Sequence, residues 1–458
     1  MKKNNHFIAY MIAIMIMLFS VPVKAQTKTG YAEWDNTNKT LTFRGGDSVP
    51  EGAYSLNAGN DLPGWLENSS CEIVVFDDSF KDVRPTSCCT WFQHFSALQT
   101  IVGIENLNTE KVTSMNSMFG SCKSLRSLDL SSFNTKKVTD MICMFAGCNN
   151  LITIYVSDKF TTDKVTTNSW GFIMHMNMFD GCTQLQGAAS YISDKVDKSM
   201  ANYKKGYFKT YYKLGNEKKV ELYRDKFTVG SLVLSDDKNF VAHAPFKANS
   251  VSYSRNNITS DSKWYTLCLP FAYNTPTNFT AYQLKSATSN SVEIEEITGE
   301  IAAGTPIIFK FNGDDKNINI TANDADIKND PGMASTTEGN GCQLFGTYQK
   351  KIFSSQDYNT FIIYKDKLMN PAKMLQNNRA TTVGLKPFHA YTTMTSQTSA
   401  KSFSIGSGDE ETTVIDLLNS VATDDAEYYD INGRRIDAPV KGVNIVRRGN
   451  KTMKLIIK

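Results

Sequence analysis

The chain has 458 residues, of which 41% are hydrophobic and 21% are charged, a composition typical of a folded protein. Its 49 Lys and Arg residues exceed its 46 Asp and Glu residues by three, and Lys2, Lys3 and Lys24 account for that excess. A nucleic-acid-binding protein normally carries a strong basic excess, so the composition excludes nucleic acid as a partner. The length is sufficient for about two to four domains.

Residues 1–25 have the pattern of a signal peptide. Lys2 and Lys3 precede an apolar run from Phe7 to Phe19, which is too short to cross the roughly 30 Å of a bilayer core comfortably. A transmembrane anchor is therefore the weaker alternative. The sequence "VPVKAQ" provides a small-residue cleavage site between Ala25 and Gln26. We expect an exported protein, located at the cell surface or outside the cell, with no transmembrane span after signal removal.

A phrase of the sequence repeats after 26 residues: "VTSMNSMFGSCKSL" begins at Val112 and "VTDMICMFAGCNNL" begins at Val138. The apolar residues of each copy lie at offsets 0, 3, 6, 7, 10 and 13, the spacing of one face of an α-helix. A Thr, Ser or Asp near the start of each copy stands where an N-cap would be. A cofactor pocket is the less favoured interpretation of this Met-Phe stripe. The predicted repeat core comprises Met118, Phe119, Cys122, Leu125, Leu128, Leu130, Met144, Phe145, Cys148 and Leu151.

After each predicted helix the pattern changes to L-x-x-L-x-L, as at Leu125, Leu128 and Leu130. This spacing predicts a short strand whose apolar side chains point inward while Asp129 points outward. One such unit cannot bury its own apolar face, so the copies must stack. We therefore predict an α/β solenoid of leucine-rich repeats over residues 26–212, with degenerate copies near Phe92 and Met178.

The nine cysteines are predicted to be mainly packing residues. Cys122, Cys148 and Cys182 each lie four residues after a Met, at one position of the repeat, where a small buried apolar residue is expected rather than half of a disulfide. A pairing of Cys71 or of the adjacent Cys88 and Cys89 stays open. No Cys or His spacing indicates zinc.

The repeat phrase, from Val112 to Leu151, resembles the BspA-type leucine-rich repeat surface proteins of Bacteroidetes. The resemblance extends from Thr27 to near Tyr212, because "YSLNAGNDLPGWL" and "GCTQLQGAASYI" are similar to the segments that begin and end the repeats in that family. It implies binding at the cell surface, including adhesion to host or neighbouring-cell components, without catalysis.

Residues 213–406 contain short Val, Ile, Phe and Tyr runs such as "KWYTLCLPF" and "AAGTPIIFKF", separated by Asn, Gly, Asp and Ser clusters. This spacing predicts an antiparallel β-sandwich. Pro270, Pro306 and Pro387 lie near the ends of runs, where a sheet tolerates proline. Together with the repeats, the predicted fold class is α+β.

Residues 407–423 read as a linker, and residues 424–458 as a small β tail. The tail resembles the carboxy-terminal sorting domain of type IX secretion substrates, although Asn444 stands where that family usually has an aromatic residue. A hairpin that merely caps the sandwich is the alternative. The resemblance implies the secretion machinery as a partner, and it is carried by Gly433, Gly442, Lys451, Lys454 and Lys458.

The sequence offers no motif of an enzyme or a cofactor site. His94, His175, His243 and His389 share no metal-ligand spacing, and P-loop and dinucleotide fingerprints are absent. Asp314 with Asp315, or the segment 323–330, could supply oxygen ligands for calcium, but the EF-hand order is missing and a solvated loop is favoured. We expect no catalytic, cofactor-binding or metal-binding residue.

The predicted function is binding to a host extracellular or bacterial surface protein or glycan, with variable outward residues of the repeats selecting the ligand. The segment "YKKGYFKTYYK" (Tyr203 to Lys213) alternates basic and aromatic residues as a glycan or anionic surface contact would, although a closing strand of the repeats is the simpler interpretation. A carbohydrate-capturing or carbohydrate-processing protein acting through the sandwich is the alternative, and a structural surface-layer component is a third. The candidate outward residues are Arg126, Asp129, Ser131 and Lys136.

Overall fold

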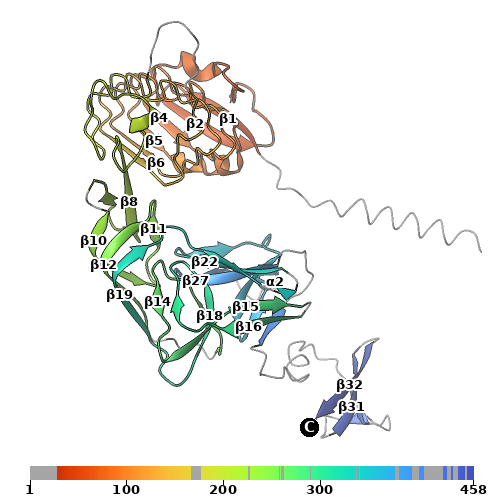
Figure 1. Ribbon diagram of the computed structural model, residues 1–458. Helices are drawn as coiled ribbons and strands as arrows, with labels where there is room; N and C mark the ends of the chain where they lie inside the picture. The colour runs from red at the N-terminus through yellow and green to blue at the C-terminus, as the bar shows by residue number, and fades with distance from the viewer. Residues whose placement is uncertain are drawn as a thin grey trace, which may run out of the picture. The chain divides into compact units, whose positions relative to one another are not determined.

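The computed structural model of the chain is shown in Figure 1. It describes residues 28–166, 177–224, 227–256, 258, 262–288, 290–336, 338–339, 341–376, 381–394 and 402–406, and four strands at 427–430, 435–436, 442–448 and 451–457. The predicted signal peptide with Ala25 and Gln26, the linker 407–423, His175, Gly433 and Lys458 lie outside the described residues.

The chain forms two compact units. The first comprises the chain up to Val229 together with Val241–Lys247, and the second comprises Gly230–Phe240 and the chain from Ala248 onward. The predicted border at 212/213 falls instead inside strand β8 (Phe208–Leu214), which belongs to the first unit.

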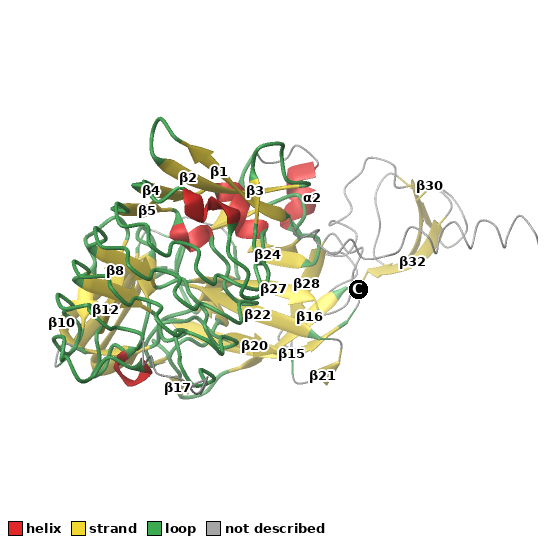
Figure 2. Cartoon of the chain, turned by 90° about the horizontal axis from the view of Figure 1, so that it is seen from above, coloured by secondary structure: helices red, strands yellow, loops and turns green. Residues whose placement is uncertain are grey.

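The fold class is mostly β, so the prediction of an α+β protein with a leucine-rich α/β solenoid is wrong. Strands and loops dominate the described chain, and α2 (Pro371–Gln376) is the only α-helix found in it (Figure 2). The remaining helical turns of the described chain are short 3-10 helices: η1 (Gly64–Glu67), η2 (Asp78–Asp82), η3 (Ile104–Asn106) and η4 (Lys198–Met200).

The first unit begins with a five-stranded sheet of order β3-β1-β2-β4-β5. Its antiparallel hairpin is followed by parallel strands, and the buried side chains alternate with outward ones as a half-buried sheet requires. Leu41, Phe43, Val74 and Phe76 face the core. The strands are β1 (Thr29–Asp35), β2 (Thr40–Gly46), β3 (Tyr54–Ser55), β4 (Ile73–Phe76) and β5 (Thr100–Val102).

The repeated phrase then builds stacked coils, each with one short parallel strand. Leu128 of β6 (Ser127–Leu130) pairs with Ile154 of β7 (Thr153–Val156), 26 residues later, and Ile154 pairs with Phe208 of β8. The sheet has the order β11-β8-β7-β6, with β9 (Val220–Leu222) also on β8 and β11 at Phe240–Ala242. Strand existence and spacing were thus predictable from the L-x-x-L-x-L pattern.

The segments predicted as helices, 112–125 and 138–151, are not helical. Ser117, Ser121, Cys143 and Gly147 have φ values of +52°, +62°, +56° and +76°. An α-helix needs φ near −63° at every residue, so these left-handed positions break it. Alternate N–H groups point at the next coil instead: Ser117 N donates to Ile142 O at 2.8 Å and Phe119 N donates to Met144 O at 2.9 Å.

The intervening N–H groups close local turns, as in the bond from Met118 N to Met115 O. A turn that closes every three residues and a helix of 3.6 residues per turn both put residues three apart on one face. The apolar offsets therefore predicted correctly which side chains are buried, but the α-helical backbone conformation predicted from them is wrong.

The predicted repeat-core residues lie in one continuous apolar core, none more than 2% exposed. Phe119 stacks on Phe145 with ring centroids 5.8 Å apart and planes 2° apart, and Phe145 stacks in turn on Phe179. The repeated cysteines reach back one coil, because Cys148 Sγ donates to Phe119 O at 2.9 Å and Cys122 Sγ donates to Phe92 O at 3.1 Å. No disulfide bond links the nine cysteines, all of which lie in the described chain and are buried.

The second unit is not a two-sheet sandwich, which corrects the second part of the fold prediction. Its main sheet has 11 strands and curls back on itself like half of a barrel. Thr266 Oγ1, in the first strand β13, accepts a bond from Ala390 N of β27 at 2.9 Å. The core inside the curl includes Trp264, Phe361 and Phe403. A period-2 pattern alone does not distinguish one curled sheet from two packed sheets.

The strands of this 11-stranded sheet, in spatial order, are β13 (Tyr265–Leu267), β18 (Ile307–Phe311), β15 (Phe279–Ala287), β16 (Ser291–Glu296), β28 (Ser402–Gly406), β25 (Lys367–Met369), β24 (Thr360–Tyr364), β27 (His389–Met394), β22 (Cys342–Thr347) and β20 (Met333–Ser335), with β21 (Glu338–Gly339) on β15. A three-stranded sheet joins β10 (Thr228–Ser235), β12 (Phe246–Arg255) and β19 (Ile318–Ile327). Two small pairs are β14 (Tyr273–Asn274) with β17 (Glu300–Ile301), and β23 (Lys351–Phe353) with β26 (Val383–Leu385).

The tail forms a four-stranded antiparallel sheet of order β30-β29-β31-β32. Gly442 opens β31 (Gly442–Arg448), Lys451 opens β32 (Lys451–Ile457), and Lys454 lies within β32. The other two strands are β29 (Glu427–Asp430) and β30 (Arg435–Ile436).

Candidate functional site

The candidate outward residues separate into two groups in the first unit. Asp129 and Ser131 lie on the outward face of the sheet β11-β8-β7-β6, whereas Lys136 lines a groove. The basic and aromatic segment from Tyr203 contributes to both places. Arg126 is exposed immediately before β6 and belongs to neither.

The first place, the tyrosine–lysine face, consists of outward side chains on neighbouring strands: Asp129, Tyr155, Lys209, Tyr211, Lys219 and Glu221. Strand register brings them together, since Asp129 pairs with Tyr155, Tyr155 with Lys209, and Tyr211 with Glu221. Period-2 alternation places the five strand residues on one side of the sheet, and Lys219 immediately precedes β9. Sequence positions up to 92 residues apart thus share one surface.

Lys219 is the centre of this face. Its ammonium lies 4.4 Å from the ring centroid of Tyr211 and 4.5 Å from that of Tyr155, and it forms an ion pair with Asp129. The two rings meet edge to face with centroids 5.4 Å apart. A cation between two aromatic faces is attracted by both ring quadrupoles, which holds the side chain in place.

The tyrosine hydroxyls are also held. Tyr211 donates to Asp129 Oδ2 at 2.9 Å, and Tyr155 donates to Glu221 Oε1. Glu221 accepts a further bond from Lys209 at 3.1 Å. The face is therefore a rigid surface of aromatic flanks and paired charges rather than a set of mobile side chains.

Burial and pairing set the charge states here. Burial alone would raise the pKa of Asp129, but hydrogen bonds from Lys219 and Ser131 outweigh it and bring the pKa below the ordinary value. Burial raises the pKa of Tyr155 and Tyr211, so both phenols stay neutral. His243, whose ring lies 4.5 Å from that of Tyr211, has a lowered pKa because it is buried.

The second place, the lysine groove, is an open cavity of about 520 Å³. It is formed by three segments that are far apart in sequence, around Lys136, Phe160 and Tyr203. Its lining residues are Lys136, Asp158, Phe160, Thr161, Asp163, Lys164, Asn202, Tyr203 and Lys204.

Hydrogen bonds fix the groove walls. Thr135 Oγ1 donates to Thr161 O at 2.7 Å and accepts from Thr161 N at 2.7 Å, which joins two coils. Asn202 Oδ1 accepts from Lys204 N at 3.1 Å, which shapes the turn that carries Tyr203. The three groove lysines are exposed, and within the described residues none of them has an ion-pair partner.

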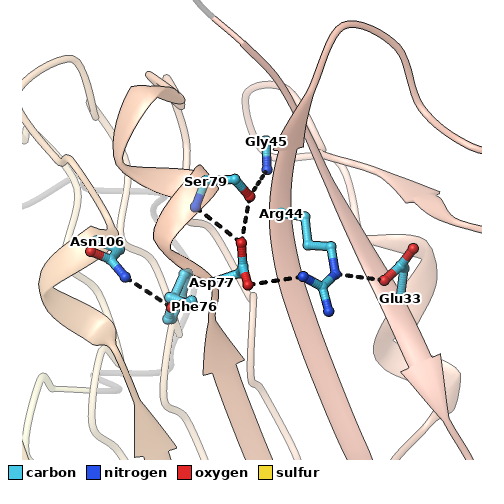
Figure 3. Close-up of polar contacts among 7 residues, drawn as sticks. All are labelled: Glu33, Arg44, Gly45, Phe76, Asp77, Ser79 and Asn106. Atoms are coloured by element: carbon cyan, nitrogen blue, oxygen red, sulfur yellow. Dashed lines mark hydrogen bonds and ion pairs between the residues drawn. The ribbon is translucent and has the colours of Figure 1, made fainter.

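A third polar cluster lies at the start of the first unit, and its charged side chains are paired with one another (Figure 3). Arg44 bridges Glu33 and Asp77 at 2.9 Å each, and Ser79 Oγ donates to Asp77 at 2.7 Å while accepting from Gly45 N. The hydrogen bonds from Ser79 hold the pKa of Asp77 below its usual value. Every charge has its partner within the cluster, so its role is to join β1, β2 and the turn after β4.

Among the described residues, the other polar segments singled out in the sequence form no recognisable metal cluster. His94 is exposed, and the described chain contains no group of three or more His, Cys, Asp or Glu side chains arranged for a metal. Residues 323–327, in the segment considered for calcium, are part of strand β19, and Asp315 accepts bonds from Asn317. No helix in the described residues is long and apolar enough to span a membrane.

Sequence reasoning missed Tyr155, Lys164, Lys219 and Glu221. Tyr155 had a usable signal, because it is the outward residue between the buried Ile154 and Val156. Lys219 and Glu221 had none, since their position depends on the return of the chain through β9.

Comparison with known proteins gives one match. Residues 86–210 match the family model described as "Mycoplasma protein of unknown function, DUF285". The matched part covers the stacked coils up to β8 and leaves out the second unit. No curated protein and no solved structure matches the chain.

Proposed function

We propose that the protein is an exported, non-catalytic binding protein of the cell surface that attaches to host or bacterial surface ligands through its stacked coils. The observation that carries this proposal is the lysine groove, which is lined by three lysines, Lys136, Lys164 and Lys204, against two carboxylates, Asp158 and Asp163. Unpaired ammonium groups in a shaped groove attract acidic groups of a ligand.

The tyrosine–lysine face supports the same function. Rigid tyrosines provide contact area at a low cost in conformational entropy, and on this face Tyr155 is partly exposed whereas Tyr211 is only 6% exposed and supports it from below. The groove and this face are linked through one residue, because His243 O accepts a bond from Asp158 N of the groove while the His243 ring packs on Tyr211. A ligand in the groove would therefore lie close to a preorganised aromatic surface.

The route to the surface is part of the proposal. The predicted signal peptide directs export, and the resemblance of the tail to a type IX sorting domain supports delivery by that secretion machinery. A strain expressing the chain without residues 424–458 should retain the protein inside the cell envelope, whereas the full chain reaches the surface. Surface display of both forms, measured by antibody labelling of intact cells, would contradict the role of the tail.

Binding is tested with the mature chain, residues 26–458, on immobilised matrix proteins, bacterial cells and polysaccharides. Replacing Lys136, Lys164 and Lys204 by Gln should weaken saturable retention at least about tenfold, equivalent to about 1.4 kcal/mol. Retention of the parent chain should also fall with added salt, because the Debye length shrinks from about 10 Å at 0.1 M to about 3 Å at 1 M.

The matched control replaces three exposed lysines of the same unit outside the groove, Lys111, Lys123 and Lys195, by Gln. This variant has the same net charge as the groove variant and should bind like the parent. Equal losses in both variants would mean that only overall charge matters, and the proposal would fail. Release of soluble product in the same wells would contradict a purely binding role.

A further inference from the structure

The second unit contains a cleft of about 1050 Å³ that the function proposed above does not use. It lies where several strands end, with walls from β10, β12, β13, β26 and β27 and from the turn between β24 and β25. Its volume is at the upper end of the range of about 300–1000 Å³ typical of ligand sites. Polar side chains from β10, β12, β13 and β27 and from the turn between β24 and β25 line it, which distinguishes it from an apolar packing defect.

A buried charged network forms one wall of the cleft. Arg255 is 7% exposed and Asp236 is 8% exposed, and Arg255 Nε lies 3.0 Å from Asp236 Oδ2. Arg255 Nε also donates to Tyr253 Oη at 2.9 Å, and its Nη1 donates to Thr266 O at 3.1 Å. These bonds fix the guanidinium plane and neutralise its charge. An Arg has five N–H donors, so the fixed guanidinium has donor capacity beyond these contacts.

His389 stands next to this guanidinium along the cleft wall. Its Nδ1 lies 3.0 Å from Pro387 O, and Arg255 Nη2 is directed at the carbonyl of Phe388. A carbonyl only accepts, so Nδ1 carries the proton and Nε2 of the neutral ring is an acceptor. Burial and the neighbouring Arg255 hold the pKa of His389 well below its usual value, which keeps the ring neutral.

The rim of the cleft has balanced charge and aromatic surface. Two carboxylates, Asp237 and Asp366, and two ammonium groups, Lys365 and Lys386, balance in number, so no net charge of the rim favours an ionic ligand. Asp366 is already engaged, because Ser262 Oγ donates to it at 3.0 Å. Tyr364 lines the cleft and is 47% exposed; the ammonium of Lys365 lies 5.5 Å from its ring centroid, and the exposed part of the ring offers contact area for an apolar patch of a ligand.

We propose that this cleft is a second binding site, specific for uncharged sugar residues of a glycan. Neighbouring hydroxyls of a sugar both donate and accept, and they match the fixed donors of Arg255 and the Nε2 acceptor of His389. The C–H face of a sugar ring would pack on Tyr364. Asp236 and Arg255 neutralise one another, and the rim carries two carboxylates and two ammonium groups, so neither an anionic nor a cationic ligand gains a net attraction here.

The test is affinity electrophoresis of the mature chain in gels that contain one neutral polysaccharide each: an α-glucan, a β-glucan, a mannan, a xylan or a galactan. Gels with heparin or polygalacturonate are run in parallel. At least one neutral polysaccharide should retard the protein. Tyr364→Ala and His389→Phe should each weaken that retardation at least about tenfold.

Tyr358→Ala is the matched control, since Tyr358 is a 43% exposed tyrosine of the same unit that does not line the cleft. It should run like the parent chain. If His389→Phe does not fold, the rim pair Asp237→Asn and Lys386→Met replaces it and should weaken retardation in the same direction. The proposal is overturned if no neutral polysaccharide retards the parent, if only the anionic polymers do, or if the cleft variants behave like Tyr358→Ala.

Discussion

Asp129 illustrates how much one outward residue of a repeat depends on distant chain segments. It accepts from Tyr211 and from the ammonium of Lys219, residues 82 and 90 positions further along the chain. The strand pattern predicted that Asp129 points outward. Its partners Tyr211 and Lys219 lie in β8 and immediately before β9. These segments are outside the repeated phrase, so the repeat pattern does not predict the contacts.

Replacing Asp129 by Asn should lower the free energy of unfolding at pH 7 by about 1–2 kcal/mol, because hydrogen bonds to a charged group are lost. The folded-state pKa of Asp129 lies below its ordinary value of 3.8, so the carboxylate stabilises the fold above that pH and loses this contribution as the pH falls through the lowered pKa. Urea unfolding at pH 7 and pH 3 should therefore show a difference between variant and parent that shrinks at pH 3. A constant difference would contradict the assignment.

Within a single coil, the residues with left-handed φ values determine the path of the backbone. Thr90, Ser117 and Cys143 have positive φ at one place of successive coils, and His94, Ser121 and Gly147 have it at another. The residue type varies while the conformation recurs. Only Gly147 adopts it without steric cost, so the conformation is imposed by the hydrogen bonds between coils rather than by local preference.

Gly147→Ala should destabilise the protein by about 1–2 kcal/mol, because an added Cβ would be held at a φ of +76° and 3.0 Å from Ser121 Oγ. The opposite substitution, Ser121→Gly, should leave the stability of the protein unchanged or raise it, because glycine adopts the φ of +62° at position 121 without steric cost. Thermal unfolding followed by circular dichroism checks both. A loss of stability in Ser121→Gly as large as that in Gly147→Ala would show that backbone conformation is not the cause.

For the whole molecule, the two compact units have separate apolar cores. Phe119 lies in the core of the stacked coils, between Phe92 and Phe145. Phe361 lies inside the curled sheet and packs on Phe403 with centroids 4.9 Å apart. Since the two clusters share no residue, each unit is expected to unfold as its own cooperative body.

Differential scanning calorimetry should therefore show two transitions. Phe119→Ala should lower only one of them and Phe361→Ala only the other, each by the several degrees that correspond to about 3–5 kcal/mol for a buried Phe truncated to Ala. Both side chains are fully buried, so the two variants control for one another. A single transition that shifts with either substitution would contradict two independent units.

The sequence by itself determined which side chains are buried and where the short repeat strands run. Period-2 spacing placed Leu128 and Leu130 inward and Asp129 outward, and the 26-residue repeat predicted that copies stack. These features depend on local periodicity, which is visible along the chain. The sequence indicated Lys136 and the segment beginning at Tyr203 as two separate candidate contact regions, and the structure brings them together in one groove.

Only the tertiary structure decided the backbone between the strands, the shape of the second unit and the composition of the sites. The apolar spacing from Met115 to Cys122 is compatible with an α-helix. In the structure, N–H groups of this segment donate to carbonyls of the next coil instead of forming helical hydrogen bonds. Because the acceptors belong to another coil, the segment's own sequence does not reveal them. The bond from Ala390 N to Thr266 joins the first strand of the large sheet to β27, and the contact of Arg255 with Phe388 O joins two walls of the cleft. Hydrogen bonds between residues more than 120 positions apart leave no local pattern, so the physical cause of these features lies in long-range pairing.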